Sequence, residues 1–180
     1  MLHFITTLDR DVTAYIASLL PHNAFFNSIF SFLSLQGLTI IIWIVLFAFF
    51  VYRERFDNTH RQFIIAFAIS FLTTSFLVNI VIKNIVMRER PWVVQQISET
   101  ICPDDFSFPS GHAAGAFAGA IIFAHFDRKR NWLYYGIAGL ISLSRIYLQC
   151  HYFLDVMTGA LIGFLMGWAT LWLFTHRNII

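Results

Sequence analysis

Long apolar runs separated by short polar segments dominate the pattern of the chain. Two runs of 21 residues, Gln62–Ile82 and Val156–His176, contain no Lys, Arg, Asp or Glu. The apolar stretch from residue 12 to residue 52 is divided at residues 21–23, which leaves Phe25–Tyr52 as a third long run. Because about 20 apolar residues suffice for a helix to cross a bilayer, each of these three runs predicts a transmembrane helix.

Two further runs, Ala113–Phe126 and Trp132–Leu148, are shorter and contain glycines. We expect them to form helices packed among the other three, since glycine lets helices approach closely in lipid. The pattern therefore predicts an all-α fold, an integral membrane bundle of five transmembrane helices. We expect residues 1–180 to form a single domain, with the bundle at residues 25–176.

The first 22 residues predict a different element. They carry three charges at residues 9–11 and too few apolar residues after them to cross the bilayer. They also lack the basic start and the small-residue cleavage site of a signal peptide. We expect residues 1–22 to form an amphipathic helix on the membrane surface. A sixth, frayed span is the alternative.

The composition supports a membrane protein. The chain is 58% hydrophobic and 12% charged, with a mean hydropathy of +0.67. So little charge, spread over long apolar runs, is typical of a protein embedded in the bilayer. The net charge of +2 is too weak to indicate a nucleic-acid partner. The sequence leaves the oligomeric state open.

The basic residues predict how the bundle is oriented, because short basic loops favour the cytoplasmic side. Seven basic residues lie between or after the predicted spans: Arg53, Arg55, Arg61, Arg128, Lys129, Arg130 and Arg177. Placing them inside puts residues 88–110 and 146–151 on the extracytoplasmic side of the membrane. Four other basic residues then cluster at outer helix ends: Lys83, Arg88, Arg90 and Arg145. Ionisable groups at membrane depth are costly and usually functional, so this cluster predicts a site.

The first motif of this site is "KNIVMRERP", residues 83–91. Lys83 and Arg90 are seven residues apart, which predicts two side chains on nearly the same helical face. Pro91 is then expected to end the helix. The plainer interpretation is a lysine and an arginine that extend to the interface from a helix end.

The second motif is "PSGH", residues 109–112, at the opening of the third predicted span. The first N–H groups of a helix are unpaired and attract phosphate-like anions. Gly111 permits close approach, Ser110 adds a hydroxyl group, and His112 adds a titratable proton. An ordinary proline turn with a capping serine is the alternative.

The third motif contains Ser144, Arg145, His151 and Asp155. His151 and Asp155 are four residues apart, a spacing that stacks them on one helical face. A carboxylate that holds one imidazole nitrogen leaves the other free to attack, as in an activated nucleophile. A His–Asp pair that only satisfies itself in the core is the alternative.

Two rows of glycines indicate that these motifs converge. Each row repeats at steps of four: Gly111, Gly115 and Gly119 in one, and Gly159, Gly163 and Gly167 in the other. If the two rows pack together, His112 and His151 meet at the outer boundary; packing against other helices is the alternative. Arginines, a lysine, a helix start and two histidines together predict phosphoryl transfer. No carboxylate cluster suits Mg²⁺, so we expect no metal and no cofactor.

The three motifs, in this order and spacing, resemble the signature of the type 2 phosphatidic acid phosphatase (PAP2) superfamily. That superfamily includes membrane lipid phosphatases and the soluble vanadium haloperoxidases. The resemblance covers residues 83–155 and is complete at the signature positions. It implies a membrane lipid-phosphate phosphatase that works without a metal. Members often have six spans, whereas the pattern here predicts five and a surface helix.

The resemblance also implies a role for each matching residue. His151 is the nucleophile that forms a phosphohistidine, Asp155 orients it, and His112 is the general acid. The remaining matching residues form the phosphate-binding set: Lys83, Arg90, Ser110, Gly111 and Arg145. The substrate is a lipid phosphate of the bilayer, of the phosphatidic acid or phosphatidylglycerophosphate type.

Three other functions share part of this pattern. Undecaprenyl-pyrophosphate hydrolysis is the alternative within the same enzyme class. A non-catalytic anion channel or transporter would use the basic cluster but would not require the paired histidines. Haloperoxidase chemistry is disfavoured because those relatives are soluble and this chain is apolar.

Cys102 and Cys150 both fall on the predicted outer side, and Cys150 precedes His151 directly. Their spacing does not match a metal site. A disulfide between them would hold the loop at residues 92–108 over the site. Two free, buried thiols are the alternative.

Overall fold

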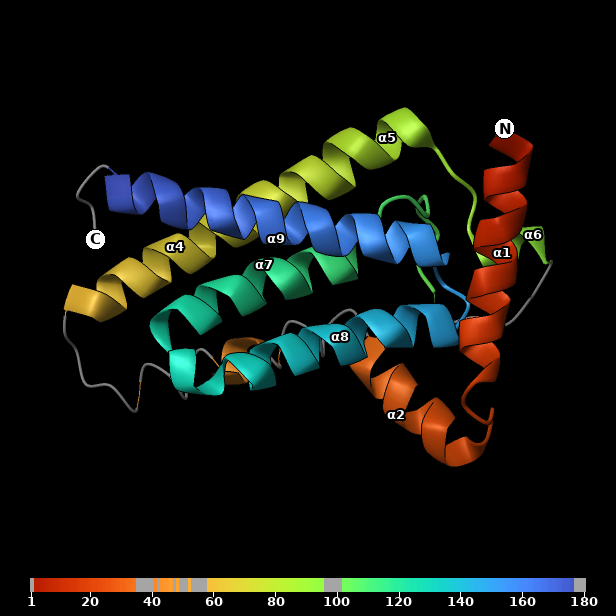
Figure 1. The fold of residues 1–180 in the computed structure, drawn as a ribbon, viewed down its shortest axis with the longest axis horizontal. Helices are drawn as coiled ribbons and strands as arrows, with labels where there is room; N and C mark the ends of the chain where they lie inside the picture. The colour runs from red at the N-terminus through yellow and green to blue at the C-terminus, as the bar shows by residue number, and fades with distance from the viewer. Residues whose placement is uncertain are drawn as a thin grey trace.

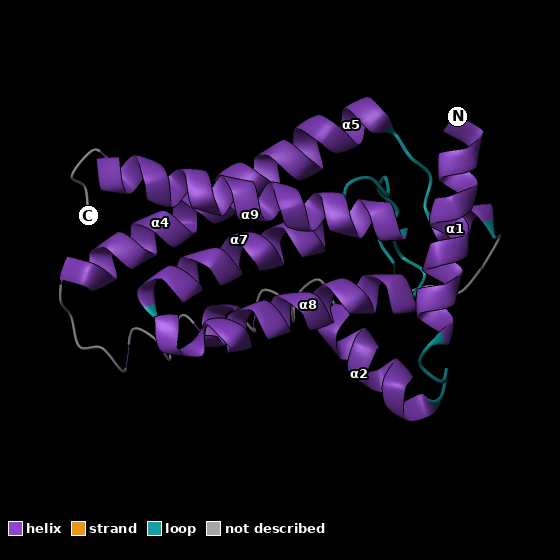
Figure 2. Ribbon diagram, in the orientation of Figure 1, coloured by secondary structure: helices purple, strands orange, loops and turns teal. Residues whose placement is uncertain are grey.

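The computed structural model describes residues 2–34, 58–95 and 102–176, together with several residues between 41 and 52. Within these residues the chain forms helices and connecting turns, with no strand (Figure 2). The elements in chain order are α1 (Leu2–Ser18), α2 (Ala24–Ser34), α4 (Asn58–Ser75), a π-helical segment (Phe76–Ile82), α5 (Lys83–Val86), α6 (Pro91–Val94), α7 (Gly111–Phe126), a 3-10 turn (Arg128–Arg130), α8 (Asn131–Tyr147) and α9 (Phe153–His176).

The long helices α4, α7, α8 and α9 run roughly along one axis, and α7 lies between the other three (Figure 1). The π-helical segment continues α4 directly into α5. Helix α1 crosses this axis at one end of the bundle, and α2 packs against α8 (Figure 1). The connections that carry the three sequence motifs gather at the same end as α1. The fold therefore brings distant motifs to one end of the bundle.

Aromatic side chains fill the centre of the bundle. Phe63 of α4 meets Phe123 of α7 edge to face, with ring centroids 4.9 Å apart. Tyr134 of α8 packs on the same Phe123, with ring centroids 5.1 Å apart and the ring planes tilted by 35°. Because lipid tails are as apolar as these side chains, such packing contacts hold helices together in a bilayer.

The contact between α7 and α9 depends on glycine, as expected. A Cβ added to Gly159 would collide with the carbonyl oxygen of Ser110, and one added to Gly163 would collide with that of Ala114. The α7 glycine row, however, does not take part, so the predicted packing of the two rows is wrong. Gly115 faces Phe71 of α4 instead. The row 110, 114 and 118 is also made of small residues, and it supplies the surface that meets α9.

The outward faces of α4 and α9 are apolar. The exposed side chains on these helices and the π-helical segment include Ile64, Ile65, Ile69, Leu72, Phe76, Ile80, Met157, Leu161, Phe164, Leu165, Trp168 and Trp172. Two stretches, Arg61–Val94 and Phe153–His176, are long and apolar enough to cross a membrane, while α2 and α7 are shorter apolar helices. The predicted all-α fold is confirmed. The predicted span Phe25–Tyr52 is only partly covered by the described residues, so the number of spans stays a prediction.

Candidate active site

The first motif does not lie on one helix, contrary to the prediction. Helix α5 ends at Val86 because Met87 adopts a left-handed backbone with φ of 50°, a conformation that terminates helices. Arg90 is extended, and Pro91 begins α6 instead of ending the preceding helix. Lys83 and Arg90 therefore come from different elements, but their side chains bind the same partner.

That partner is Asp105, which the sequence analysis missed. The Asp105 carboxylate accepts hydrogen bonds from Lys83 Nζ and Arg90 Nη2, and its backbone oxygen accepts one from Arg90 Nε at 2.7 Å. Burial raises the pKa of Asp105, but the hydrogen bond from Lys83 and the charge of Arg90 outweigh this, so the net pKa is lowered. An ionised carboxylate thus engages donors that a phosphate oxygen would use.

His151 and Asp155 are close, but not through the direct contact on one helix that the spacing predicted. His151 precedes α9, and its Nδ1 lies 3.8 Å from Asp155 Oδ2. Ser107 lies between them: its Oγ donates to Asp155 Oδ2 at 2.5 Å and lies 3.5 Å from His151 Nδ1. Asp155 Oδ2 also accepts the backbone N–H of Tyr152 at 2.9 Å. The pair is therefore bridged by a serine hydroxyl group that sequence reasoning did not identify.

The other ring nitrogen of His151 faces a guanidinium group. Arg90 Nη1 lies 3.0 Å from His151 Nε2 and donates to the Cys150 carbonyl oxygen at 2.8 Å. Burial lowers the pKa of His151 well below its usual value, and the positive charges of Arg90, Arg145 and Lys83 lower it further. The imidazole is thus neutral at neutral pH, the state required of a nucleophile.

The second motif begins a helix, as predicted. Ser110 Oγ caps α7 by accepting the N–H of Ala113 at 3.4 Å. The N–H of Ser110 donates to the backbone oxygen of Asp155 at 2.9 Å, which ties the start of α7 to the start of α9. The first N–H groups of α7, at Gly111 and His112, have no partner within the helix. The capping serine and the anion-binding helix start, two interpretations of the same motif, are therefore compatible.

A cavity of about 370 Å³ opens between α4 and α7 beside these residues. Four of the predicted site residues line it: Lys83, Arg90, Gly111 and His112. The other four are fully buried next to it: Ser110, Arg145, His151 and Asp155. The charges of Arg145, His151, Lys83 and Arg90 all act on His112. All eight predicted residues are thus gathered at this end of the bundle.

Along the α4 side of the cavity the lining changes from charged to apolar. Lys83, Asn79, Ser75 and Phe71 follow one another at steps of four residues, and all four line it. Asn79 Nδ2 donates to Ser75 Oγ at 3.1 Å. The remaining apolar lining comprises Trp43, Pro103, Gly115 and Ala116. The cavity thus has a cationic end, an uncharged polar zone and an apolar end.

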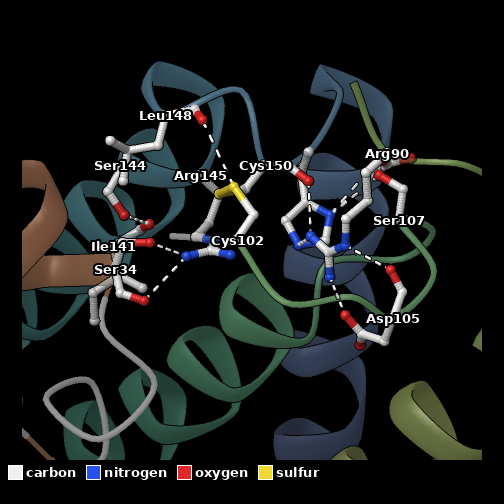
Figure 3. The surroundings of a disulfide bond; sticks show 12 residues. Ser34, Arg90, Cys102, Asp105, Ser107, Ile141, Ser144, Arg145, Leu148 and Cys150 are labelled. Carbon is white, nitrogen blue, oxygen red and sulfur yellow. Dashed lines mark hydrogen bonds and ion pairs between the residues drawn. A yellow bond between two sulfur atoms is a disulfide. The ribbon is translucent and has the colours of Figure 1, made fainter. Parts of the chain in front are cut away.

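Arg145 reaches a different partner from Arg90. Its Nη1 donates to the backbone oxygen of Ser34 at 3.1 Å and to the Ser34 hydroxyl group, as Figure 3 shows. Its Nε and Nη2 are buried and make no hydrogen bond with any of the described residues. Buried donors are seldom left unpaired, so these two guanidinium nitrogens are suited to donate to an anionic ligand.

Cys102 and Cys150 form a disulfide, with Cα atoms 5.4 Å apart (Figure 3). The bond joins the loop that carries Asp105 and Ser107 to the turn that carries His151. Of the two alternatives that the sequence left open, the bonded form is the one in the structure. The nucleophile candidate and its partners are therefore linked covalently.

Comparison with known proteins agrees with this geometry. The profile described as "PAP2 superfamily" matches residues 62–179. The chain belongs to the PAP2 superfamily. The match includes all eight predicted site residues of this PAP2 protein, whereas α1 and α2 lie outside it.

Named PAP2 relatives act on different lipid phosphates. The undecaprenyl-diphosphatase BcrC of Bacillus subtilis (strain 168) is 26% identical over 162 residues, which cover 89% of this chain and 81% of that protein. Phosphatidylglycerophosphatase B of the same strain is 30% identical over 128 residues, covering 65% of this chain and 58% of that protein. The crystal structure of a transmembrane PAP2-type phosphatidylglycerolphosphate phosphatase from Bacillus subtilis matches with a TM-score of 0.66 and 21% identity, covering 96% of this chain and 87% of that one. The fold is thus that of a membrane PAP2 phosphatase.

Proposed function

We propose that this PAP2 protein hydrolyses the phosphomonoester of a membrane lipid phosphate through a phosphohistidine intermediate. The observation that carries the proposal is the position of His151, whose neutral ring lies against Arg90 at the cationic end of a cavity that becomes apolar. A phosphate group bound by Lys83 and Arg90 would lie next to His151 Nε2. The lipid chain would then extend along α7 past Gly115 toward Trp43.

Each residue has a defined task in the proposed reaction. Nε2 of His151 attacks phosphorus and forms a P–N bond while the bond from phosphorus to the lipid oxygen breaks. His112 gives its proton to the departing alkoxide, and Lys83, Arg90 and Arg145 neutralise charge on the phosphoryl oxygens. Water, deprotonated by His112, then cleaves the P–N bond and releases inorganic phosphate.

The charge of the cavity favours a monophosphate over a diphosphate. Among the described lining residues, two cations, Lys83 and Arg90, face one anion, Asp105. Next to Lys83, toward the apolar end of the cavity, the lining offers the neutral amide of Asn79 and the hydroxyl group of Ser75. These groups suit ester or hydroxyl groups better than a second phosphate. These contacts support a glycerophospholipid of the phosphatidic acid or phosphatidylglycerophosphate type. The 26% identical undecaprenyl-diphosphatase, which matches most of the chain, supports undecaprenyl pyrophosphate as the second candidate.

The site is proposed to face the extracytoplasmic side of a bacterial or archaeal membrane spanned five times. The disulfide between Cys102 and Cys150 supports this orientation, since disulfides persist in oxidising compartments. Cysteines introduced at Gln96 and at Asn131 test it in intact cells with an impermeant thiol reagent. Labelling at position 96 alone is expected, and labelling at position 131 alone would reverse the orientation.

The function is tested by incubating purified protein with lipid phosphates and measuring released phosphate. The panel contains phosphatidic acid, phosphatidylglycerophosphate and undecaprenyl pyrophosphate, each with and without EDTA. We expect turnover of the glycerophospholipids in EDTA, inhibition by vanadate, and none in His151→Ala. Asn79→Leu should lower turnover of the glycerophospholipids relative to the polyprenyl substrate. Ion flux across the membrane of proteoliposomes that contain the protein, without phosphate release, would instead indicate a channel or transporter.

A further inference from the structure

Helix α1 presents a polar stripe to the end of the bundle that holds the site. The Asp9 side chain is 1% exposed, and Thr13 and Ala17, one and two turns further on, are also buried. Most of its large apolar side chains are exposed, namely Phe4, Ile5, Leu8 and Tyr15, whereas Ile16 packs against the bundle. The apolar face of an amphipathic helix in a membrane protein can lie in lipid instead of in the protein. The polar stripe of α1 then contacts the residues beneath it.

Arg88 connects this stripe to Asp155. Its Nη2 donates to Asp9 Oδ2 and its Nη1 donates to Asp155 Oδ1, both at 2.6 Å. The guanidinium also lies over the ring of Tyr152, with Cζ 3.9 Å from the ring centroid. One arginine thus joins two buried carboxylates that are far apart in the sequence.

The same helix also caps the start of α9. Asp9 Oδ1 accepts the N–H of Leu154 at 2.8 Å, and Thr13 Oγ1 accepts the N–H of Phe153 at 2.9 Å. The first N–H groups of a helix have no partner of their own within it. Here, α1 supplies two of those partners, in the turn of α9 that carries Asp155.

We propose that Asp9 is a positioning residue for the reaction, and that α1 is part of the active-site framework. Asp9 holds Arg88 and the first turn of α9, and these together hold Asp155 Oδ1. Asp155 Oδ2 is then directed to Ser107, whose hydroxyl group faces His151. The inference rests on the proposed function, and it adds a helix outside the residues that match the PAP2 profile.

The negative charge of Asp9 has an electrostatic consequence as well. When His151 is phosphorylated its ring becomes cationic, and Asp155 stabilises that charge. Without Asp9, the charge of Arg88 would be balanced by Asp155 alone, and Asp155 would stabilise the cation less. The other charged and titratable groups around His151 would be unchanged by a substitution at Asp9: Lys83, Arg90, Arg145 and His112.

The test compares full-length variants in detergent with p-nitrophenyl phosphate as substrate. Asp9→Asn should lower kcat about tenfold with little change in KM, and should move the acidic limb of the kcat profile to lower pH. Asp9→Glu should restore part of kcat. Asp11→Asn, an equal charge change at an exposed position of α1, should have neither effect. Thr13→Val, which removes a cap but no charge, should leave the acidic limb in place.

Hydrogen exchange gives a readout that needs no turnover. In Asp9→Asn, and not in Asp11→Asn, the amides of Phe153 and Leu154 should exchange faster. Unchanged exchange together with wild-type kcat in Asp9→Asn would overturn the inference. So would a loss of kcat that Thr13→Val reproduces with the acidic limb unmoved, because that result describes a structural cap alone. A wild-type protein that releases no phosphate from any substrate refutes the proposed function instead. The exchange result then decides whether Asp9 holds α1 against the start of α9.

Discussion

The guanidinium nitrogen Nη1 of Arg90 lies 3.0 Å from Nε2 of His151. A guanidinium only donates hydrogen bonds and is not deprotonated in proteins, so Nε2 must be the acceptor. The ring proton of the neutral histidine is therefore on Nδ1, which faces Ser107. This tautomer leaves the Nε2 lone pair at the cationic end of the cavity, where the proposed attack on phosphorus requires it.

The two histidines should respond differently to the leaving group. His151→Ala should abolish turnover and any phosphoenzyme with every substrate, because it removes the nucleophile. His112→Ala should lose about 10²–10⁴ in rate with lipid phosphates, the usual value of general acid catalysis. It should lose much less with p-nitrophenyl phosphate, whose phenolate leaves without a proton. The measurement is the mutant-to-wild-type ratio of kcat for both substrates.

Asp155→Asn should lower kcat as His151→Ala does, since it disturbs the tautomer of His151. Ser107→Ala should also lower kcat, by a smaller factor. Equal losses with both substrates in His112→Ala, combined with rescue of His151→Ala by the better leaving group, would mean that the roles are reversed.

Replacing Asp105 should strengthen anion binding. The ionised carboxylate competes for Lys83 and Arg90, so Asp105→Asn should lower the inhibition constant of vanadate. We expect the inhibition constant to fall about fivefold. This factor corresponds to ~1 kcal/mol, the energy between two unit charges 4 Å apart in water. The control is Asp104→Asn, an exposed neighbour with the same charge change. Weaker inhibition in Asp105→Asn would mean that this carboxylate orients the two cations more than it competes with the ligand.

His151 should make stability depend on pH. Its pKa in the folded protein lies well below the usual value of 6.5, so the unfolded chain binds this proton more readily. The free energy of unfolding therefore falls as pH decreases through that usual value, by at most about 1.4 kcal/mol per pH unit. His151→Asn removes this contribution. The Tm of wild type minus that of His151→Asn should decrease from about pH 7.5 to about pH 5.5. A constant or increasing difference would contradict the neutral state.

Local patterns predicted the helices, and distant contacts decided the site. The apolar runs of α4, α7, α8 and α9 and the helix start at Ser110 depend on nearby residues, and a single sequence carries that information. The bridge from Ser107 to Asp155 joins residues 48 positions apart, and the link from Arg88 to Asp9 joins residues 79 apart. No short motif reports such pairs.

The spacing of residues did not indicate that α5 ends at Val86. Met87 is not a residue typical of the left-handed conformation, so the interval between Lys83 and Arg90 was interpreted as continuous helix. An acidic pair, Asp104 and Asp105, precedes "PSGH" by a few residues and was the one pointer to Asp105 in the sequence. The sequence did not indicate which side of α1 faces the protein, for a different reason. Patterns assign the buried side to apolar residues, whereas here the polar stripe faces the protein.

Breaking the disulfide should loosen the site. Replacing Cys102 and Cys150 together by serine releases a cross-link between residues 48 apart, which the chain-entropy model values at about 4 kcal/mol. We expect a lower Tm and lower kcat, because Asp105, Ser107 and His151 are all carried by the linked segments. Dithiothreitol should lower the Tm of wild type toward that of the double variant and leave the variant unchanged. An equal response of both to the reductant would place the effect elsewhere.

The contact between α7 and α9 should tolerate no added methyl group at Gly163. A Cβ there would collide with the backbone oxygen of Ala114, and backbone atoms inside two packed helices cannot move aside cheaply. Gly163→Ala should therefore lower the free energy of unfolding by about 1–3 kcal/mol. Gly136→Ala is the matched control, because a Cβ at that position of α8 meets no atom within 4 Å. It should be neutral or stabilising by about 0.5–1 kcal/mol, since alanine favours a helix over glycine. Thermal unfolding of both variants in the same detergent measures the contrast. Equal Tm values for the two variants would show that α7 and α9 are further apart than the structure has them, and that the positions of Ser110 and Asp155 do not depend on this glycine row.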